Sequence, residues 1–435
     1  MEEGGKVLRT TLAAGYGTRL KFPTNARVSG VPAFINKMRN TIKLAARATI
    51  TWIQAVGLLP VVVLVAAIRP FILIRFGVMD ASRIGHLCNT GGYLCLRDLE
   101  SSKHRILDFI GCSTKVCNQQ LKAMFARTLP IFPGAWLLRG LARSCQVWTR
   151  SDVHCIGFTP RDFRLLDSAE PCLHFTEDEH RQGRRLLERL GIPAGARWVC
   201  LHNRDRVYLD TTQAGRDWTY HDYRDFSVQS MQLAAEELAR RGYYVLRMGS
   251  LTEQHLVSSN SKVIDYANHV ERNDFADIYL LGNCRFYLGS ESGIFAVSAL
   301  FRRPFAFINF PVPQPCYDLY HWNPVPFILK CAWHKAKGRF LSLRELFKLD
   351  LASAYTTDAF EAAGVELLCN TPEEICDLAT EVDDRCHGHW QANPHDEELQ
   401  ERFWEIFHQH NPHNKITVKA RIGTAFLRKH VDLLK

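Results

Sequence analysis

Three short polar segments each begin at or just past the end of a predicted strand, and together their side chains could bind a phosphorylated ligand. The segments are His202-Asn203-Arg204-Asp205, Arg247-Met248-Gly249-Ser250 and Gly289-Ser290-Glu291-Ser292-Gly293. Ligands of an open parallel sheet bind beyond the carboxyl ends of its strands, so we expect these segments to meet at one edge of a sheet. Arginine forks, small residues and a helix N-terminus are groups that suit a diphosphate.

These groups have both a functional and a structural interpretation. Arg204 and Arg247 are predicted to neutralise a diphosphate, and the loop from Ser290 to Gly293 is predicted to hold phosphate or ribose. The structural alternative is an ion-pair network made with carboxylates, together with a serine-capped helix that binds nothing. The carboxylates available for that network are Asp205, Asp210 and Asp222.

A general base is sought among the titratable residues near these segments. Asp205, His202, Asp222 and Glu291 could each serve as the base or orient the nucleotide, and Asp205 is preferred among them; the alternative for the carboxylates is a structural ion pair with an arginine. His86 is the other preferred base; it lies at a strand-to-helix turn nearer the N-terminus, where it could instead cap the helix. The chain has no Asp-x-Asp motif to hold a metal against a diphosphate, so positive side chains are expected to stabilise the leaving group without metal or cofactor.

The elements that must position these residues alternate between strand and helix. Strands are predicted at 198–202, 243–247, 263–266, 285–288 and 304–309, and helices at 177–190, 226–241, 273–281 and from residue 293. This alternation predicts an α/β fold with a parallel, doubly wound sheet. A further strand at 70–77 opens an earlier α/β domain. Residues 311–337 are expected to form a basic, proline-rich loop, with helices at 373–385 and 397–407 after it.

Length and composition bound the function. A chain of 435 residues is too long for one ordinary core and predicts two domains. The net charge of +9 suits an anionic partner, but no zinc-finger spacing, aromatic RNA-binding signature or lysine run indicates nucleic acid. The fourteen cysteines form no Cys-x-x-Cys pair, so they are expected to be thiols in a reducing cytoplasm.

An uncharged segment from Ala48 to Ile68 is just long enough to cross a bilayer as a helix. Pro60 and Gln54 interrupt it, and basic residues flank both of its ends. We therefore favour a helix that lies in or dips into the membrane surface, which would place the protein on the inner face of the cytoplasmic membrane. The alternatives are a true span and a soluble helix buried on the domain.

Several segments resemble bacterial glycosyltransferases encoded among surface-polysaccharide genes and, more distantly, fucosyltransferases and heptosyltransferases. The matching pieces are Ile74–Leu87, His202–Asp210, His221–Phe226, Leu246–Ser250, Tyr287–Asn309 and Asn370–Ile375. The resemblance implies a GT-B fold with two facing Rossmann-like domains. It also implies that Arg204, in a His-x-Arg signature, contacts the β-phosphate of the donor. Asp205 stands where those groups often have a second arginine.

The expected organisation follows from this resemblance. A leader with the apolar helix (1–69) precedes an acceptor domain (70–185), a nucleotide-sugar donor domain (186–395) and a helical tail that packs across the cleft (396–435). The expected activity is transfer of a sugar from a nucleotide-sugar to a polysaccharide, glycan or lipid-linked acceptor. A sugar-nucleotide epimerase and a non-catalytic nucleotide-binding scaffold of a polysaccharide assembly complex are the alternatives.

Overall fold

The computed structural model divides the chain into two compact units, Met1–Gly57 and Leu58–Lys435. Few residues of the first unit are described, so the account below concerns the second. The described residues are 38, 41, 49, 52–100, 105–158, 166, 170–212, 215, 217–313, 326–391, 393–410 and 419–435.

The second unit begins with a small parallel sheet. Its two strands are β1 (Leu73–Met79) and β2 (Ile106–Cys112), and isolated bridges at Cys155 and Ile131 extend it on either side. The helices around it are α4 (Ile84–Glu100), α5 (Gln119–Ala126) and α6 (Ala135–Thr149). Among the described residues, this sheet is smaller than the doubly wound sheet predicted for 70–185, because most segments after β2 form helices and loops.

A seven-stranded parallel sheet forms the centre of the second unit. Its strands are β3 (Trp198–His202), β4 (Tyr244–Arg247), β5 (Val263–Ile264), β6 (Tyr287–Gly289), β7 (Phe305–Phe310), β8 (Pro326–Leu329) and β12 (Arg421–Ile422). The order across the sheet is β12-β8-β7-β6-β3-β4-β5. The predicted parallel sheet is confirmed, and this order is that of a Rossmann fold, in which the chain starts at the centre and winds outward twice.

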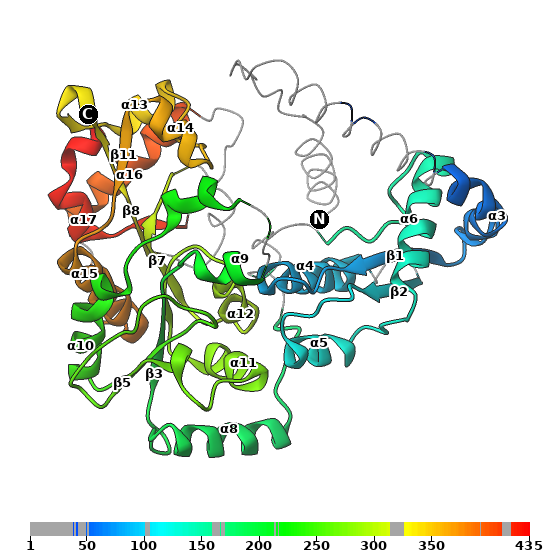
Figure 1. Ribbon diagram of the computed structural model, residues 1–435, viewed down its shortest axis with the longest axis horizontal. Helices are drawn as coiled ribbons and strands as arrows, with labels where there is room; N and C mark the ends of the chain where they lie inside the picture. The colour runs from blue at the N-terminus through cyan, green and yellow to red at the C-terminus, as the bar shows by residue number, and fades with distance from the viewer. Residues whose placement is uncertain are drawn as a thin grey trace. The chain divides into compact units, whose positions relative to one another are not determined.

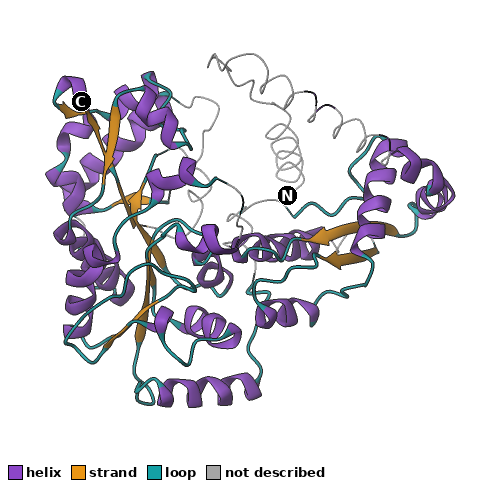
Figure 2. Cartoon of the chain, in the orientation of Figure 1, coloured by secondary structure: helices purple, strands orange, loops and turns teal. Residues whose placement is uncertain are grey.

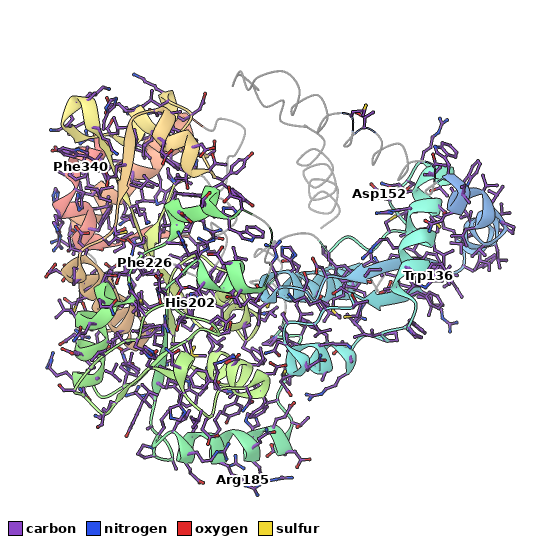
Figure 3. The ribbon with its side chains drawn as sticks, in the orientation of Figure 1. Trp136, Asp152, Arg185, His202, Phe226 and Phe340 are labelled. Carbon is purple, nitrogen blue, oxygen red and sulfur yellow. The ribbon has the colours of Figure 1, made fainter. Side chains whose placement is uncertain are left out.

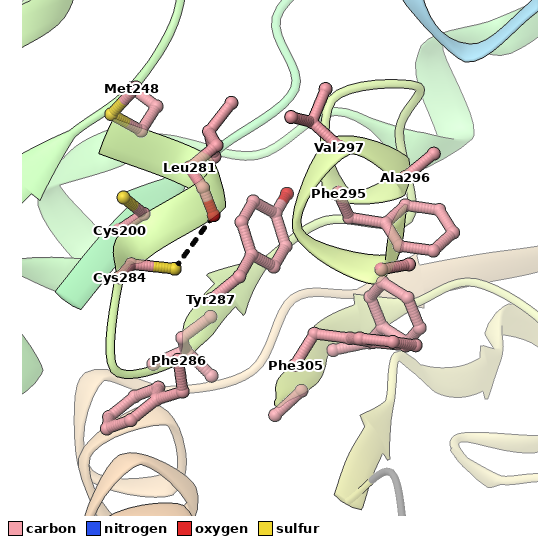
Figure 4. Close-up of a cluster of buried hydrophobic side chains, with 14 of the residues drawn as sticks. Cys200, Met248, Leu281, Cys284, Phe286, Tyr287, Phe295, Ala296, Val297 and Phe305 are labelled. Atoms are coloured by element: carbon pink, nitrogen blue, oxygen red, sulfur yellow. Dashed lines mark hydrogen bonds between the residues drawn. The ribbon is translucent and has the colours of Figure 1, made fainter. Parts of the chain in front are cut away.

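Helices cover both faces of this sheet. α10 (Gln232–Arg240) and α15 (Pro372–His387) pack together on one face, and α11 (Asp274–Asn283) and α12 (Phe295–Leu300) on the other (Figures 1 and 2). All six residues of β7 are buried, as expected for a strand covered on both faces. Figure 4 shows the aromatic part of the core, where side chains of β6, α12 and β7 meet.

The C-terminal third contains strands where a loop was predicted. β8 and β9 (Cys331–His334) lie within 311–337, and β9 pairs with β10 (Arg339–Phe340) and β11 (Val365–Leu368) in an antiparallel sheet. The loop prediction was wrong for these residues, because strand pairing outweighs their basic composition. No disulfide joins the cysteines that the structure describes.

The C-terminal tail adds the last strand to the seven-stranded sheet. α16 (Pro394–Gln409) packs against α17 (Thr424–Lys429), and β12 joins β8 in parallel. The predicted packing of this tail across the cleft is not seen among its described residues, because strand pairing holds it to the far edge of the sheet.

The part of the predicted apolar helix that belongs to the second unit is α3 (Leu59–Ile68), with Pro60 in its first turn. Val62 and Val65 pack against α6, whereas Val63 and Leu64 are exposed. In the described part of the chain, no helix has the length and apolar character needed to cross a membrane.

Candidate active site

The predicted site lies where the strand order reverses. The chain leaves β3 toward β4 and β5, then crosses to β6 on the other side of β3. Loops that follow β3 and β6 therefore diverge and open a crevice, the usual ligand site of such a sheet. His202 is paired with Gly289, and a Cβ on Gly289 would lie 2.2 Å from the His202 carbonyl oxygen. Gly289 therefore allows the two strand ends to pack closely.

A cavity of about 350 Å³ occupies this crevice. It brings together nine of the predicted site residues: His86, His202, Asn203, Arg204, Asp205, Gly249, Ser250, Ser292 and Gly293. Four others are not among its lining residues: Arg247, Gly289, Ser290 and Glu291. Residues 83–86, which follow β1 of the small sheet, form one wall. The cavity therefore lies between the part of this unit built on the small sheet and the part built on the seven-stranded sheet.

Arg204 lies almost fully buried in the wall of this cavity. Its Nη1 donates a hydrogen bond to the His221 carbonyl oxygen at 3.0 Å and forms an ion pair with Asp225. Burial raises the pKa of Asp225 to about 6, although Arg204 acts in the opposite direction. The guanidinium is thus held in place by these partners in a residue that lines the cavity, an arrangement suited to binding an anion.

Arg247 has a different position from the one predicted. Its side chain is fully buried and donates to Asn203 Oδ1 at 3.0 Å and to Asp265 at 3.4 Å. Asn203 in turn donates to the Phe226 carbonyl oxygen at 3.2 Å. Arg247 therefore supports the loop after β3 from inside the protein. Its guanidinium is buried and already bound to Asn203 and Asp265, so a direct contact with a diphosphate in the cavity is not supported.

His202 connects the loops that follow β3 and β6, and it is labelled in Figure 3. Its Nδ1 lies 3.2 Å from the hydroxyl oxygens of both Ser290 and Ser292, and its carbonyl oxygen accepts the Ser290 N–H at 3.0 Å. Burial, helped by Arg247 and Arg204, lowers the pKa of His202 to about 3. The imidazole is therefore neutral at neutral pH and positions Ser292 at the cavity.

The depressed pKa makes stability depend on pH. As the pH is lowered, the unfolded chain, with an ordinary histidine pKa near 6.5, binds a proton before the folded protein does. The free energy of unfolding therefore decreases as the pH drops from 6.5 to about 3. We expect His202→Gln to remove a slope of up to about 1.4 kcal/mol per pH unit in that window. Chemical denaturation at several pH values measures this. The exposed His255 provides the control variant His255→Gln, and parallel curves for all three proteins would contradict the prediction.

Glu291 and Ser290 act beside the cavity. Glu291 Oε2 accepts a hydrogen bond from Arg224 at 2.9 Å, and the Glu291 carbonyl oxygen accepts a second from the same guanidinium. Ser290 is buried against His202. Both residues shape the loop between β6 and α12, which leaves Ser292 and Gly293 as the part of this loop that lines the cavity.

The structure separates the two candidate bases. Both carboxylate oxygens of Asp205 already accept backbone hydrogen bonds, at 3.0 Å from Val207 and 3.0 Å from Glu253. His86 lies near the start of α4, and its imidazole is about two-fifths exposed. Asp205 therefore has a structural role, through backbone hydrogen bonds and not the ion pair considered from the sequence, and His86 is the more accessible proton acceptor.

The two walls of the cavity contact each other on both of its sides. A Cβ on Gly293 would lie 2.7 Å from the Gly85 nitrogen, so the starts of α4 and α12 touch at a point where only a hydrogen side chain fits. On the opposite side, Asn118 and Gln119 at the start of α5 bind Asp274 at the start of α11. The first of these contacts places the start of α4, which carries His86, beside the loop after β6.

Several cavity residues were missed by the sequence analysis. They are Arg83, Asn118, Tyr208, His221, Arg224, Arg272 and Asp277. His221 and Arg224 belong to a short 3-10 helix, Thr219–Arg224. These two residues, Arg83 and Tyr208 all lie in segments quoted for the family resemblance, so a signal for them existed. Asn118, Arg272 and Asp277 come from the starts of α5 and α11 and the loop before α11, which only tertiary packing brings to the cavity. Among the described residues, no His, Cys, Asp and Glu side chains cluster in a way that could hold a metal ion.

Comparison with known proteins adds a distant likeness. No protein-family model matches the chain, and no curated protein matches its sequence. Three similar solved structures are glycosyltransferases. They are ADP-heptose heptosyltransferase II of E. coli (12% identity, 54% of this chain, 84% of that chain, TM-score 0.30), a family 9 glycosyl transferase of Veillonella parvula (9%, 54%, 80%, 0.33) and the iron-containing dodecameric glycosyltransferase TibC of enterotoxigenic E. coli (14%, 56%, 61%, 0.31). At such scores the description of the fold rests on the strand order itself.

Proposed function

We propose that this protein is a glycosyltransferase of GT-B type that uses a nucleotide-sugar donor. One observation carries the proposal: a cavity at the switch point of a Rossmann-order sheet has an arginine on one wall and a histidine on the other. Arg204 binds the diphosphate, and Ser292 and Gly293, with Gly249 and Ser250, hold the nucleotide. His86 takes the proton of the acceptor hydroxyl.

In this proposal the donor and the acceptor bind to different parts of the unit. The Rossmann-order sheet holds the donor, and residues 70–185 hold a polysaccharide, glycan or lipid-linked acceptor. The charge of the departing diphosphate is stabilised by side chains, with no metal or cofactor required. α3 packs against this acceptor-binding part and leaves apolar side chains exposed. The proposal therefore includes a membrane surface, at which the protein would bind a lipid-linked acceptor.

A thermal-shift panel tests the donor site. We expect one nucleoside diphosphate, in EDTA, to stabilise the protein by about 2.7 kcal/mol at a hundred times its dissociation constant, and the matching monophosphate to stabilise it less. The reason is that Arg204 recognises the charge that the monophosphate lacks. Incubating the stabilising nucleotide-sugar alone and with glycan acceptors then distinguishes transfer from epimerisation, which needs no acceptor. No response to any nucleotide would overturn the proposal.

A further inference from the structure

A carboxylate outside the predicted site set lies directly beside His86. Asp80 follows β1, and its Oδ2 is 2.7 Å from His86 Nδ1. Its other oxygen, Oδ1, accepts the Ser82 backbone N–H at 3.0 Å and the Ser82 hydroxyl at 2.6 Å. This turn fixes the carboxylate ahead of α4, so one oxygen is held by the turn and the other is directed at the imidazole.

The second nitrogen of the imidazole contacts a donor. Arg83 Nη2 lies 2.9 Å from His86 Nε2, and both side chains line the cavity. A guanidinium can only donate hydrogen bonds, so Nε2 must accept this one with its lone pair. The proton of the neutral ring is then on Nδ1, from which it is donated to Asp80. The two contacts together select one tautomer and leave the basic nitrogen on the side of Arg83.

We infer that Asp80 is a positioning residue, which keeps His86 in the Nδ1–H tautomer so that Nε2 can accept the proton of the acceptor hydroxyl. The inference rests on the proposed glycosyl transfer. The hydroxyl oxygen forms a bond to the anomeric carbon while its proton passes to Nε2. The bond between the anomeric carbon and the diphosphate oxygen breaks, and the nucleoside diphosphate leaves with the electron pair. Asp80 stabilises the imidazolium that results.

The charged groups on either side of His86 bear on this role in different ways. Burial raises the pKa of Asp80, but hydrogen bonds from Ser82 and His86 outweigh it and lower that pKa to about 2, so Asp80 stays ionised and does not take the proton itself. Arg83 occupies the hydrogen-bonding position that the acceptor hydroxyl needs. Its guanidinium must therefore leave Nε2 when substrates bind, and the diphosphate offers it a new partner in the same cavity.

Asp80→Asn tests the inference with a minimal change. The amide keeps an oxygen for Ser82, but its nitrogen can only donate to His86 Nδ1 and forces the ring proton onto Nε2. We expect kcat to fall on the order of 1,000-fold, while KM for the donor stays within about threefold, because the diphosphate site is unchanged. A role in folding alone would not produce this separation of kcat from KM.

Nitrogen NMR of protein labelled at histidine reads the tautomer without any substrate. The His86 signal is identified by its loss in His86→Gln. We expect the proton on Nδ1 in the wild type and on Nε2 in Asp80→Asn. The control is Asp152→Asn, since Asp152 is an exposed carboxylate that accepts a hydrogen bond from Gln146 at 2.7 Å just beyond α6 (Figure 3). This control should change neither the tautomer nor kcat.

A wild-type ring that carries its proton on Nε2 would overturn the inference, and so would an unchanged kcat in Asp80→Asn. The two readouts also separate this inference from the proposed function. Absence of transfer from every donor, with the predicted tautomer switch still present, would reject glycosyl transfer while the Asp80 contact stood as measured.

Discussion

Arg204→Ala is expected to lower kcat/KM by on the order of 100-fold to 1,000-fold and to abolish stabilisation by nucleoside diphosphates. Arg204 is the arginine of the predicted pair that lines the cavity, and its guanidinium is held in place by Asp225 and the His221 carbonyl oxygen. An anion bound there gains charge-assisted hydrogen bonds from a group whose orientation is already fixed. Steady-state kinetics and thermal shift measure the two effects.

Loss of Arg204 also leaves the partly buried Asp225 without its ion-pair partner, which destabilises the fold independently of any ligand. The double variant Arg204→Ala/Asp225→Asn removes that unpaired charge. It should regain thermal stability but not activity. Arg206→Ala is the matched control, because Arg206 is more than half exposed, pairs with Asp210 and does not line the cavity. Equal losses in Arg204→Ala and Arg206→Ala would reject a specific anion site.

His86→Ala is expected to lower kcat by about 100-fold to 10,000-fold without weakening the binding of the nucleotide. The imidazole is the more accessible of the two preferred bases, since both oxygens of Asp205 are engaged by backbone N–H groups. Single-turnover kinetics measures the chemical step, and thermal shift with the nucleoside diphosphate measures binding.

His255→Gln is the control for this variant. His255 also lies beside an aspartate, with Nδ1 3.1 Å from Asp265, but it is largely exposed and does not line the cavity. Its replacement should leave kcat unchanged. If His86→Ala retained full turnover, the proton would have to go elsewhere, and the assignment of the base would be wrong.

Much of the seven-stranded sheet, and the loops around the site, could be predicted from the sequence by itself. Continuous apolar runs such as Phe305–Phe310 mark strands that are buried on both faces, and amphipathic runs between them mark the covering helices. Because the chain alternates strand and helix, a parallel sheet follows, and with it the expectation that polar residues after β3 and β6 share an edge. Arg204, Ser292 and His86 do line one cavity.

Only the tertiary structure decided what each polar side chain does. Arg204 and Arg247 have the same chemistry, yet Arg204, two residues past the end of β3, lines the cavity, whereas Arg247, the last residue of β4, is fully buried against Asn203. Burial and the choice of partner depend on long-range packing, which local patterns do not encode. The Asp80 contact was missed for a related reason: β1 runs to Met79, two residues past the predicted strand end, and so delivers Asp80 to the turn that orients His86.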